Sequence, residues 1–586
     1  MSLVDPRHGD AEDDAASTKR RTLLAIAGSL LAEISILKLA TAWLLLIAVP
    51  AVLLGLAPLI ASGWFATLSR KVTGPLDGLW PIALLVFVVA LGWIGGRRLA
   101  RAAEQGFWSL NSLAVQPGYA LWREGLRHLA ERILVARIGT EGRAKLRAAT
   151  AAGAGIIVCG AGLLVAALAW QKSRWIGDVA DLASPLRLAL PALANAVVIV
   201  SAYLAGAALV WGFADATMAQ PCDLAVFDTA PSAGRSWRIA HLSDLHTVGE
   251  RFGFRIESGR SGPRGNERLC RILARLDAIH AVQPLDLILI TGDITDAGRS
   301  SEWAEFLTAM EKYPELSRRT LLLPGNHDIN VVDRANPARL DLPISPGKSL
   351  RLMRALSALE AFQGDRVRVV DATTGDLGGT LSNELAPEYA AIAAFADSGT
   401  RRLSARLAQV WSDAFPMILP PETPNGLGVI LLNSNADAHF SFTNALGLIS
   451  TDQMRAIATV TRRLSRAGWI VAMHHHLVEY PRAATTFSER IGTALINGTL
   501  FVRQLQTLGE RIVAMHGHRH VDWIGDCGGV RIISAPSPVM EVTDDEPTCF
   551  HIHTLAIGCD GRLRLLRPER IEIPGDGAKS DVKAQP

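Results

Sequence analysis

Four long apolar stretches in the first 215 residues of this 586-residue chain restrict its fold more than any other feature. A helix that crosses a bilayer needs about 20 predominantly apolar residues. The candidate spans are 39–62, 79–96, 150–170 and 188–213. A buried helix of a soluble protein is the alternative for each stretch, but four such runs in succession favour a membrane. We therefore predict an α-helical membrane region with about four spans within residues 23–215.

The distribution of Lys and Arg predicts the orientation of these spans. Residues 97–149 are rich in Arg and Lys, which places this basic loop in the cytoplasm. The basic tail 1–22, which we expect to be disordered, then lies on the same side. Four spans return the chain to the cytoplasm, so the rest of a multi-pass cell-membrane protein is predicted to be cytoplasmic. Residues 23–37 are also apolar and would reverse this parity if they crossed, although Glu33 and Lys38 argue against a crossing.

Residues 120–138 of the basic loop carry apolar side chains at helical spacing. This pattern predicts an amphipathic helix, either packed on protein or lying at the membrane surface. The net charge of the chain is only +3, so we expect no nucleic-acid partner. The six cysteines form no CxxC pair, which excludes a thiolate zinc site and a disulfide framework as expectations.

After about residue 236, short apolar runs alternate with helix-like segments such as 266–281 and 301–311. Five of the runs read as strands, and each is followed at once by residue types that bind metals. The runs are 237–243, 285–290, 320–324, 469–473 and 511–515. Alternating strands and helices predict an α/β sheet. Because binding sites of such sheets form at the carboxyl ends of the strands, the five motifs should meet at one rim.

The last motif contains three histidines at alternating positions, His516, His518 and His520. In an extended segment, residues two apart point to the same side, so His518 and His520 could hold one object between them. Asp, Asn and His without Cys suit metals such as Mn, Fe or Zn. The complete set is too large for one ion and fits two ions bridged by a carboxylate. The candidate ligands are Asp244, His246, Asp293, Asn326, His474, His518 and His520.

In order, the motifs read DLH, GD, GNHD, HHH and GHRH, beginning at Asp244, Gly292, Gly325, His474 and Gly517. This series resembles the calcineurin-like metallophosphoesterase superfamily. The resemblance covers about 237–560 and implies a β-sandwich flanked by helices, which we place at 236–572. It also implies hydrolysis of a phosphoester by a metal-activated hydroxide, with two metal ions as cofactors.

Carried over to this chain, the resemblance assigns Asp244, His246 and His520 to the first metal. It assigns Asn326, His474 and His518 to the second metal, with Asp293 as the bridge. His327 would protonate the leaving group or stabilise charge on the phosphoryl oxygens, and Asp328 would orient His327. All nine residues stand at the motif positions.

Several residues keep an alternative interpretation. His476 stands where the family often has proline, so which of the three consecutive histidines binds metal stays open. His474 is favoured as the ligand, and His475 is a candidate for contacting the ligand residues without binding metal. His516 fits the end of its strand, and His551 with His553 fits an ordinary strand. Asp296 is either a functional acid or a helix cap.

Two further segments fall outside the motifs. Residues 329–425 form a long insertion that we expect to cover part of the metal rim and to limit substrate size. The tail 573–586 is expected to be disordered.

The phrasing of 291–303 and the GNHD motif most resemble the cyclic-nucleotide-phosphodiesterase-like branch, so a phosphodiester is the first expectation for the substrate. A phosphomonoester or a lipid-linked pyrophosphate is the alternative. A membrane receptor or scaffold with a silent metal-binding domain is an alternative of another class. A transporter is disfavoured, because the spans lack an obvious intramembrane charge pair.

Overall fold

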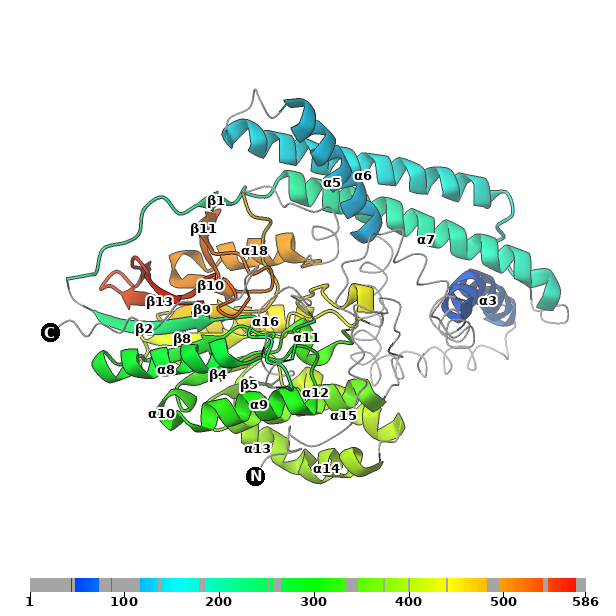
Figure 1. The fold of residues 1–586 in the computed structure, drawn as a ribbon. Helices are drawn as coiled ribbons and strands as arrows, with labels where there is room; N and C mark the ends of the chain where they lie inside the picture. Colours follow the sequence, from blue (N-terminus) through cyan, green and yellow to red (C-terminus); the bar gives the residue numbers. More distant parts are fainter. Residues whose placement is uncertain are drawn as a thin grey trace. The chain divides into compact units, whose positions relative to one another are not determined.

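The computed structural model of the chain describes thirteen segments and four single positions. These are 48–72, 116–134, 140–178, 185–232, 234–250, 253–256, 265–332, 346–371, 375–398, 401–438, 441–481, 495–540 and 546–575, with residues 44, 86, 181 and 341. The chain divides into two compact units, with the boundary between Met218 and Ala219. Each unit is described by itself (Figure 1).

The first unit is helical. Its helices are α3 (Val49–Val72), α5 (Gln116–Leu134), α6 (Thr140–Trp170) and α7 (Pro185–Ala216). Three stretches, in α3, α6 and α7, are long and apolar enough to cross a membrane, and they overlap the predicted spans 39–62, 150–170 and 188–213. The predicted span 79–96 and the tail 1–22 lie outside the described residues, apart from residue 86.

Small residues let the long helices approach closely. A Cβ on Gly212 of α7 would lie 2.9 Å from Gly155 Cα of α6, and one on Gly162 would lie 2.9 Å from the Ser201 carbonyl oxygen. Close backbone approach at small residues is how membrane helices commonly associate. Between α7 and α3, the buried Asn195 side chain donates through Nδ2 to the Gly55 carbonyl at 3.0 Å. Packing and one buried amide therefore join these helices.

The second unit contains two mixed sheets. Among the described residues, the larger sheet has nine strands. In spatial order they are β1 (Cys222–Asp223), β11 (Trp523–Cys527), β12 (Val530–Ser534), β10 (Ile512–His516), β9 (Gly468–Ala472), β8 (Leu427–Leu431), β7 (Met417–Leu419), β5 (Arg368–Val370) and β6 (Leu377–Thr380). The four central strands β12, β10, β9 and β8 are parallel.

The smaller sheet has six described strands. They are β14 (Leu563–Leu565), β13 (Thr548–Ile557), β2 (Arg235–Leu242), β3 (Leu287–Ile290) and β4 (Thr320–Leu322), with β15 (Glu569–Ile573) also paired to β13. Strands β2, β3 and β4 run parallel, and β13 is antiparallel to β2. The predicted strands before the five motifs correspond to β2, β3, β4, β9 and β10.

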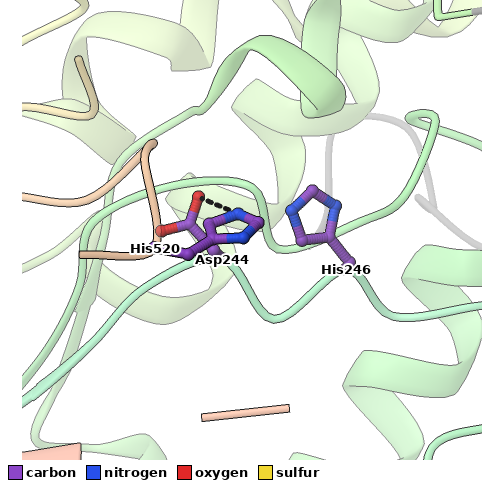
Figure 2. Close-up of side chains that lie close together, drawn as sticks. All are labelled: Asp244, His246 and His520. Carbon is purple, nitrogen blue, oxygen red and sulfur yellow. Dashed lines mark ion pairs between the residues drawn. The ribbon is translucent and has the colours of Figure 1, made fainter. Parts of the chain in front are cut away.

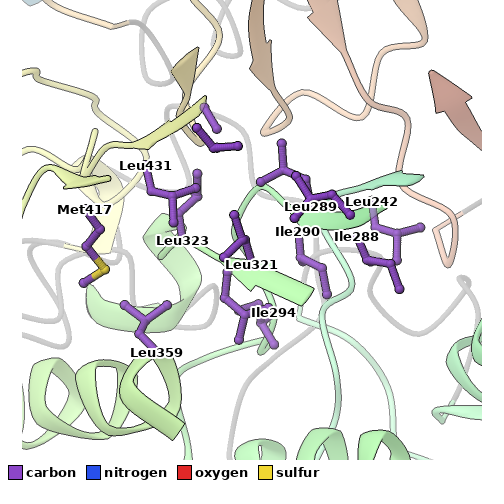
Figure 3. Close-up of a cluster of buried hydrophobic side chains, with 14 of the residues drawn as sticks. Leu242, Ile288, Leu289, Ile290, Ile294, Leu321, Leu323, Leu359, Met417 and Leu431 are labelled. Carbon is purple, nitrogen blue, oxygen red and sulfur yellow. The ribbon is translucent and has the colours of Figure 1, made fainter. Parts of the chain in front are cut away.

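One hydrophobic core joins the two sheets. It contains Leu289 and Leu321 from the smaller sheet together with Leu431 and Met417 from the larger one (Figure 3). Helices α8 (Glu267–Val282) and α9 (Ser300–Glu311) contribute buried apolar faces to the same core. Two packed sheets with helices against them agree with the sandwich that the motifs implied.

Much of the segment 329–425 is built into this core. Helix α12 (Pro346–Gln363) buries Met353 and Leu356, and strands β7, β5 and β6 extend the larger sheet. Helices α14 (Tyr389–Ser398) and α15 (Arg401–Asp413) belong to the same segment. The described part therefore supports the sandwich, and a covering role over the metal rim stays a prediction. The tail 573–586 lies outside the described residues beyond 575.

Candidate metal centre

All seven predicted ligands follow the carboxyl ends of five strands and converge at one edge of the sandwich. Asp244 and His246 follow β2, Asp293 follows β3, Asn326 follows β4, His474 follows β9, and His518 and His520 follow β10. The parallel strands of each sheet end at one edge, and the shared core brings the edges of the two sheets together. The structure forms three overlapping groups of side chains whose ligand atoms lie within 4.8 Å of one another.

The first group consists of Asp244, His246 and His520 (Figure 2). Nε2 of His520 lies 3.3 Å from Oδ1 of Asp244. The rings of His246 and His520 are 5.4 Å apart and nearly perpendicular. Asp244 and His246 are fully buried, so their polar atoms need partners inside the site.

The second group consists of Asp293, His474 and His518. Nε2 of His474 lies 3.2 Å from Oδ2 of Asp293 and 3.1 Å from Oδ1 of Asn326. Nδ1 of His474 lies 2.8 Å from the carbonyl oxygen of Thr291, which can only accept. This contact places a proton on Nδ1 and directs the lone pair of a neutral ring at Nε2 into the group.

Asp293 belongs to both neighbourhoods. Its Oδ2 is 3.2 Å from His474 Nε2 and 3.7 Å from His246 Nε2. A third group joins it to His246 and His327. One buried carboxylate thus lies between histidines from both halves of the centre, which is the position that a bridging ligand needs.

The electrostatics of the centre depend on Asp293. Burial opposes its ionisation, but the imidazoles of His474, His327 and His246 outweigh burial and hold the pKa of this carboxyl well below its usual range. Burial alone would lower the pKa of His474. The carboxylates of Asp293 and Asp244 outweigh burial and raise this pKa to about 9. Burial lowers the pKa of His518 well below its usual range, so that this ring is neutral.

The backbone at the centre is strained. Among the described residues, five non-glycine residues have φ between 41° and 75°, and all five are predicted ligands. They are Asp244, His246, Asp293, His518 and His520. Such left-handed conformations cost roughly 1–3 kcal/mol each and cluster where function requires them. The strain therefore marks the same residues as the motifs.

This strain corrects one step of the sequence argument. Residues 517–520 do not continue the extended strand, because β10 ends at His516 and both later histidines turn into left-handed conformations. His518 and His520 therefore do not hold one object between them. His518 joins Asp293, whereas His520 joins Asp244. His516 stays at the end of its strand, as expected.

Glycines in three motifs allow the loops to approach closely. A Cβ on Gly325 would lie 2.1 Å from Oδ1 of Asp293, and one on Gly517 would lie 2.5 Å from Oδ2 of Asp244. A Cβ on Gly292 would lie 2.6 Å from Nδ1 of His474. A side chain at any of these positions would displace a candidate ligand.

His327 is oriented by a group that the sequence did not assign to this role. Its Nδ1 lies 2.7 Å from the carbonyl oxygen of Asp296. The Asp328 carboxylate accepts instead from the backbone N–H groups of Thr295, Ile294 and Gly325 and from the Thr295 hydroxyl. The expected orientation of His327 by Asp328 is therefore corrected: Asp328 fixes the loop that carries Asp293.

Asp296, for which the sequence allowed either a functional acid or a helix cap, lies beside His246. It does not cap α9, whose N-cap is Arg299. Its Oδ1 lies 3.4 Å from Nδ1 of His246, and its Oδ2 accepts from the Ile256 N–H. Oδ1 of Asp296 and Nδ1 of His246 do not form a hydrogen bond, and the Asp296 carboxylate places a negative charge beside the His246 ring. In the sequence, only its position three residues after Asp293 indicated that Asp296 could lie near the candidate ligands.

The three consecutive histidines have different surroundings. His474 alone joins a group of candidate ligands, within the part of the chain that the structure describes. Nδ1 of His475 lies 2.9 Å from the Ser434 hydroxyl, and its ring lies 4.5 Å from that of His518. His476 contacts Glu479 at 3.3 Å. The geometry favours His474 as the ligand and places His475 behind His518.

The residues present fit metal ions. Neither ring nitrogen of buried His246 has a hydrogen bond, and Nε2 of His518 also lacks one. Buried imidazoles without hydrogen-bond partners, aimed at buried carboxylates, are the arrangement that a cation completes. The set of Asp, Asn and His donors without Cys does not identify the metal.

The raised pKa of His474 predicts that metal affinity depends on pH. Below about pH 9 the metal-free ring is protonated, so binding at Nε2 must release a proton. Affinity for Mn should therefore rise with pH, by up to about tenfold per pH unit, and level off above about pH 9. Calorimetric titration of the full chain in two buffers of different ionisation enthalpy measures this release. A pH-independent affinity without proton release would contradict it.

Comparison with known proteins finds a family match for part of the chain. Residues 238–378, which contain the first three motifs, match the family model described as Calcineurin-like phosphoesterase. No curated protein matches the sequence.

Two solved structures show weak similarity. Purple acid phosphatase PPD1 from yellow lupin (Lupinus luteus) is 14% identical, with 56% of this chain and 50% of that chain covered and a TM-score of 0.25. NAD nucleotidase from Haemophilus influenzae is 11% identical, with 58% and 57% covered and a TM-score of 0.29. The chain thus spans about half the length of these proteins. The family match over 238–378, together with the His and Asp groups, identifies a calcineurin-like phosphoesterase domain with candidate metal ligands in this chain.

Proposed function

We propose that the protein is a membrane-tethered phosphoesterase that uses two metal ions and hydrolyses a phosphodiester. The observation that carries this proposal is the position of Asp293, which groups with His474 and His518 on one side and with His246 and His327 on the other. One carboxylate between two sets of histidines is suited to two adjacent cations. The three apolar helices support the membrane tether.

Asp244, His246 and His520 would hold one ion, and Asn326, His474 and His518 the other. Asp293 would contact both ions. Mn, Fe and Zn all suit this ligand set. When bound, two such cations supply a hydroxide nucleophile near neutral pH and neutralise charge on the phosphoryl oxygens.

His327 would act on the leaving group. Its ring lies 4.6 Å from that of His246 at 90°, beside the first ligand group. Donation from Nδ1 to the Asp296 carbonyl would fix the ring and leave Nε2 as the nitrogen that exchanges a proton with the substrate. His327 is largely buried, so water around the transferred proton would be limited.

The phosphodiester rests on the resemblance of the GDITD and GNHD segments to phosphodiesterases. A phosphomonoester or a lipid-linked pyrophosphate fits the same metals. Because the enzyme would be tethered to a bilayer, a lipid-linked substrate would meet it at a raised effective concentration. Comparison of a diester with a monoester substrate separates the first two classes from each other, and activity with either excludes a silent scaffold.

We also propose that the metallophosphoesterase domain is cytoplasmic. The proposal rests on the basic loop 97–149 and on an even number of spans before Ala219.

Replacing the shared carboxylate should abolish turnover. Asp293→Asn removes the negative charge between the two ligand groups and should lower hydrolysis of bis-p-nitrophenyl phosphate by at least about a hundredfold. Asp452→Asn, at the exposed first turn of α16 (Thr451–Arg463), is the matched control and should retain activity. Assays of the full chain with Mn and after chelation also compare p-nitrophenyl phosphate. Activity that survives in Asp293→Asn would refute the shared ligand, and preference for the monoester would refute the diesterase.

His327→Ala should slow chemistry without emptying the metal site. If the ring protonates the leaving group, kcat for an alkyl phosphodiester should fall about 10²–10⁴-fold. The fall should be much smaller for a p-nitrophenyl ester, whose leaving group needs no proton. Metal content, measured by mass spectrometry, should not change. Equal losses for both esters, or loss of metal, would show that His327 has another role.

Reporter fusions test the topology. Alkaline phosphatase fused after Ala216, at the end of α7, should be inactive, whereas green fluorescent protein fused there should fluoresce. Active alkaline phosphatase at this point would place the domain on the opposite side of the membrane.

A further inference from the structure

Helix α5 has its charged and apolar faces reversed relative to a helix of a soluble protein. Its charged residues Glu124 and Arg127 are only 1% and 5% exposed, whereas Trp122, Leu129 and Ile133 are 48%, 55% and 68% exposed. These three apolar residues, at spacings of seven and four, lie on one face of the helix. We call this face the outer stripe.

Open space surrounds the rest of the outer stripe. A Cβ added to Gly118 or Gly125, which share this face, would meet no atom within 4 Å. Leu126, which borders the stripe, lies 3.5 Å from the Cβ position of Gly153 and so packs on α6. Among the described side chains, protein therefore covers Glu124 and Arg127 and leaves the outer stripe uncovered.

Three charged residues of α5, Arg123, Glu124 and Arg127, have partners inside the helical unit. Tyr119 donates its hydroxyl proton to Oδ2 of Asp215 at 2.9 Å, and Arg123 donates to the same oxygen at 2.8 Å. Arg123 also donates through Nε to Glu124 at 3.2 Å, and Arg127 lies 3.7 Å from Glu124. This network joins α5 to the last turn of α7.

Ionisable groups turned inward and paired, with apolar side chains turned outward, are what a helix shows when its surroundings are lipid. The neighbouring spans also expose apolar side chains. Leu168 of α6 and Phe213 of α7 are 68% and 69% exposed, and Phe213 lies two residues before Asp215. Trp122 is a residue type enriched at the membrane interface.

We propose that α5 is embedded in the surface layer of the bilayer, with the outer stripe against acyl chains. The helix is too rich in charge to cross the membrane, and its charged face is already occupied by protein, so it lies at the interface. The proposal rests on α6 and α7 crossing the membrane and does not depend on the catalytic activity.

This placement gives α5 a mechanical role. Asp215, which Tyr119 and Arg123 bind, lies four residues before Ala219, where the metallophosphoesterase unit begins. Helix α5 would thus fix the depth at which the chain leaves the bilayer.

Photo-crosslinking to lipid tests the proposal in the full-length chain, reconstituted in phosphatidylcholine vesicles. A benzophenone amino acid replaces Leu129 or Ile133, and lipid adducts are measured by mass spectrometry. Leu168 of α6 serves as the lipid-facing reference. Val282, at the end of α8 in the other unit and 87% exposed, serves as the reference for exposed apolar residues outside the helical unit.

Positions 129 and 133 should form lipid adducts at a yield close to that of 168 and several-fold above that of 282. Yields as low as that of 282, or adducts with protein in place of lipid, would overturn the proposal while 168 still labels lipid. If 168 also fails to label lipid, α6 does not cross the bilayer, and the proposal falls with that premise.

Discussion

The buried carboxylate of Asp293 is the constraint on which the rest of the metallophosphoesterase domain depends. An ionised carboxylate in a site of low polarity costs on the order of several kcal/mol unless positive charge compensates it. Here the imidazoles of His474, His327 and His246 surround it and hold its pKa low. Those rings arrive from strands of both sheets, so the compensation exists only when the sandwich is complete.

The loops after the strands adopt unusual backbone conformations that bring the candidate ligands close to Asp293. Five candidate ligands adopt left-handed conformations, and three glycines permit contacts that a Cβ would block. The large shared core of the two sheets can hold such strained loops in place, because the strands before them are fully buried. Asp328, with four donors around its carboxylate, and Asp296, behind His246, add the polar contacts that fix the loop geometry.

The sequence alone predicted the strands before the five motifs, the seven residues that converge and three of the apolar helices. These predictions succeed because apolar runs and polar ends are local patterns. Positions that depend on tertiary contacts were not predictable in this way. Alternation misplaced His518 and His520, the orienting partner of His327 is a backbone carbonyl, and the core strands within 329–425 are too short to stand out. The sequence of α5 does not show which of its faces packs on protein, because this depends on its contacts with α6 and α7.

The most direct test of a carboxylate-bridged pair of metals is low-temperature electron paramagnetic resonance of the full chain loaded with Mn. Two ions that share Asp293 should lie close enough for their spins to couple. We predict the spectrum of a coupled Mn pair at full loading, replaced by that of isolated Mn in Asp293→Asn. Isolated Mn at every loading of the unaltered chain would contradict the shared site.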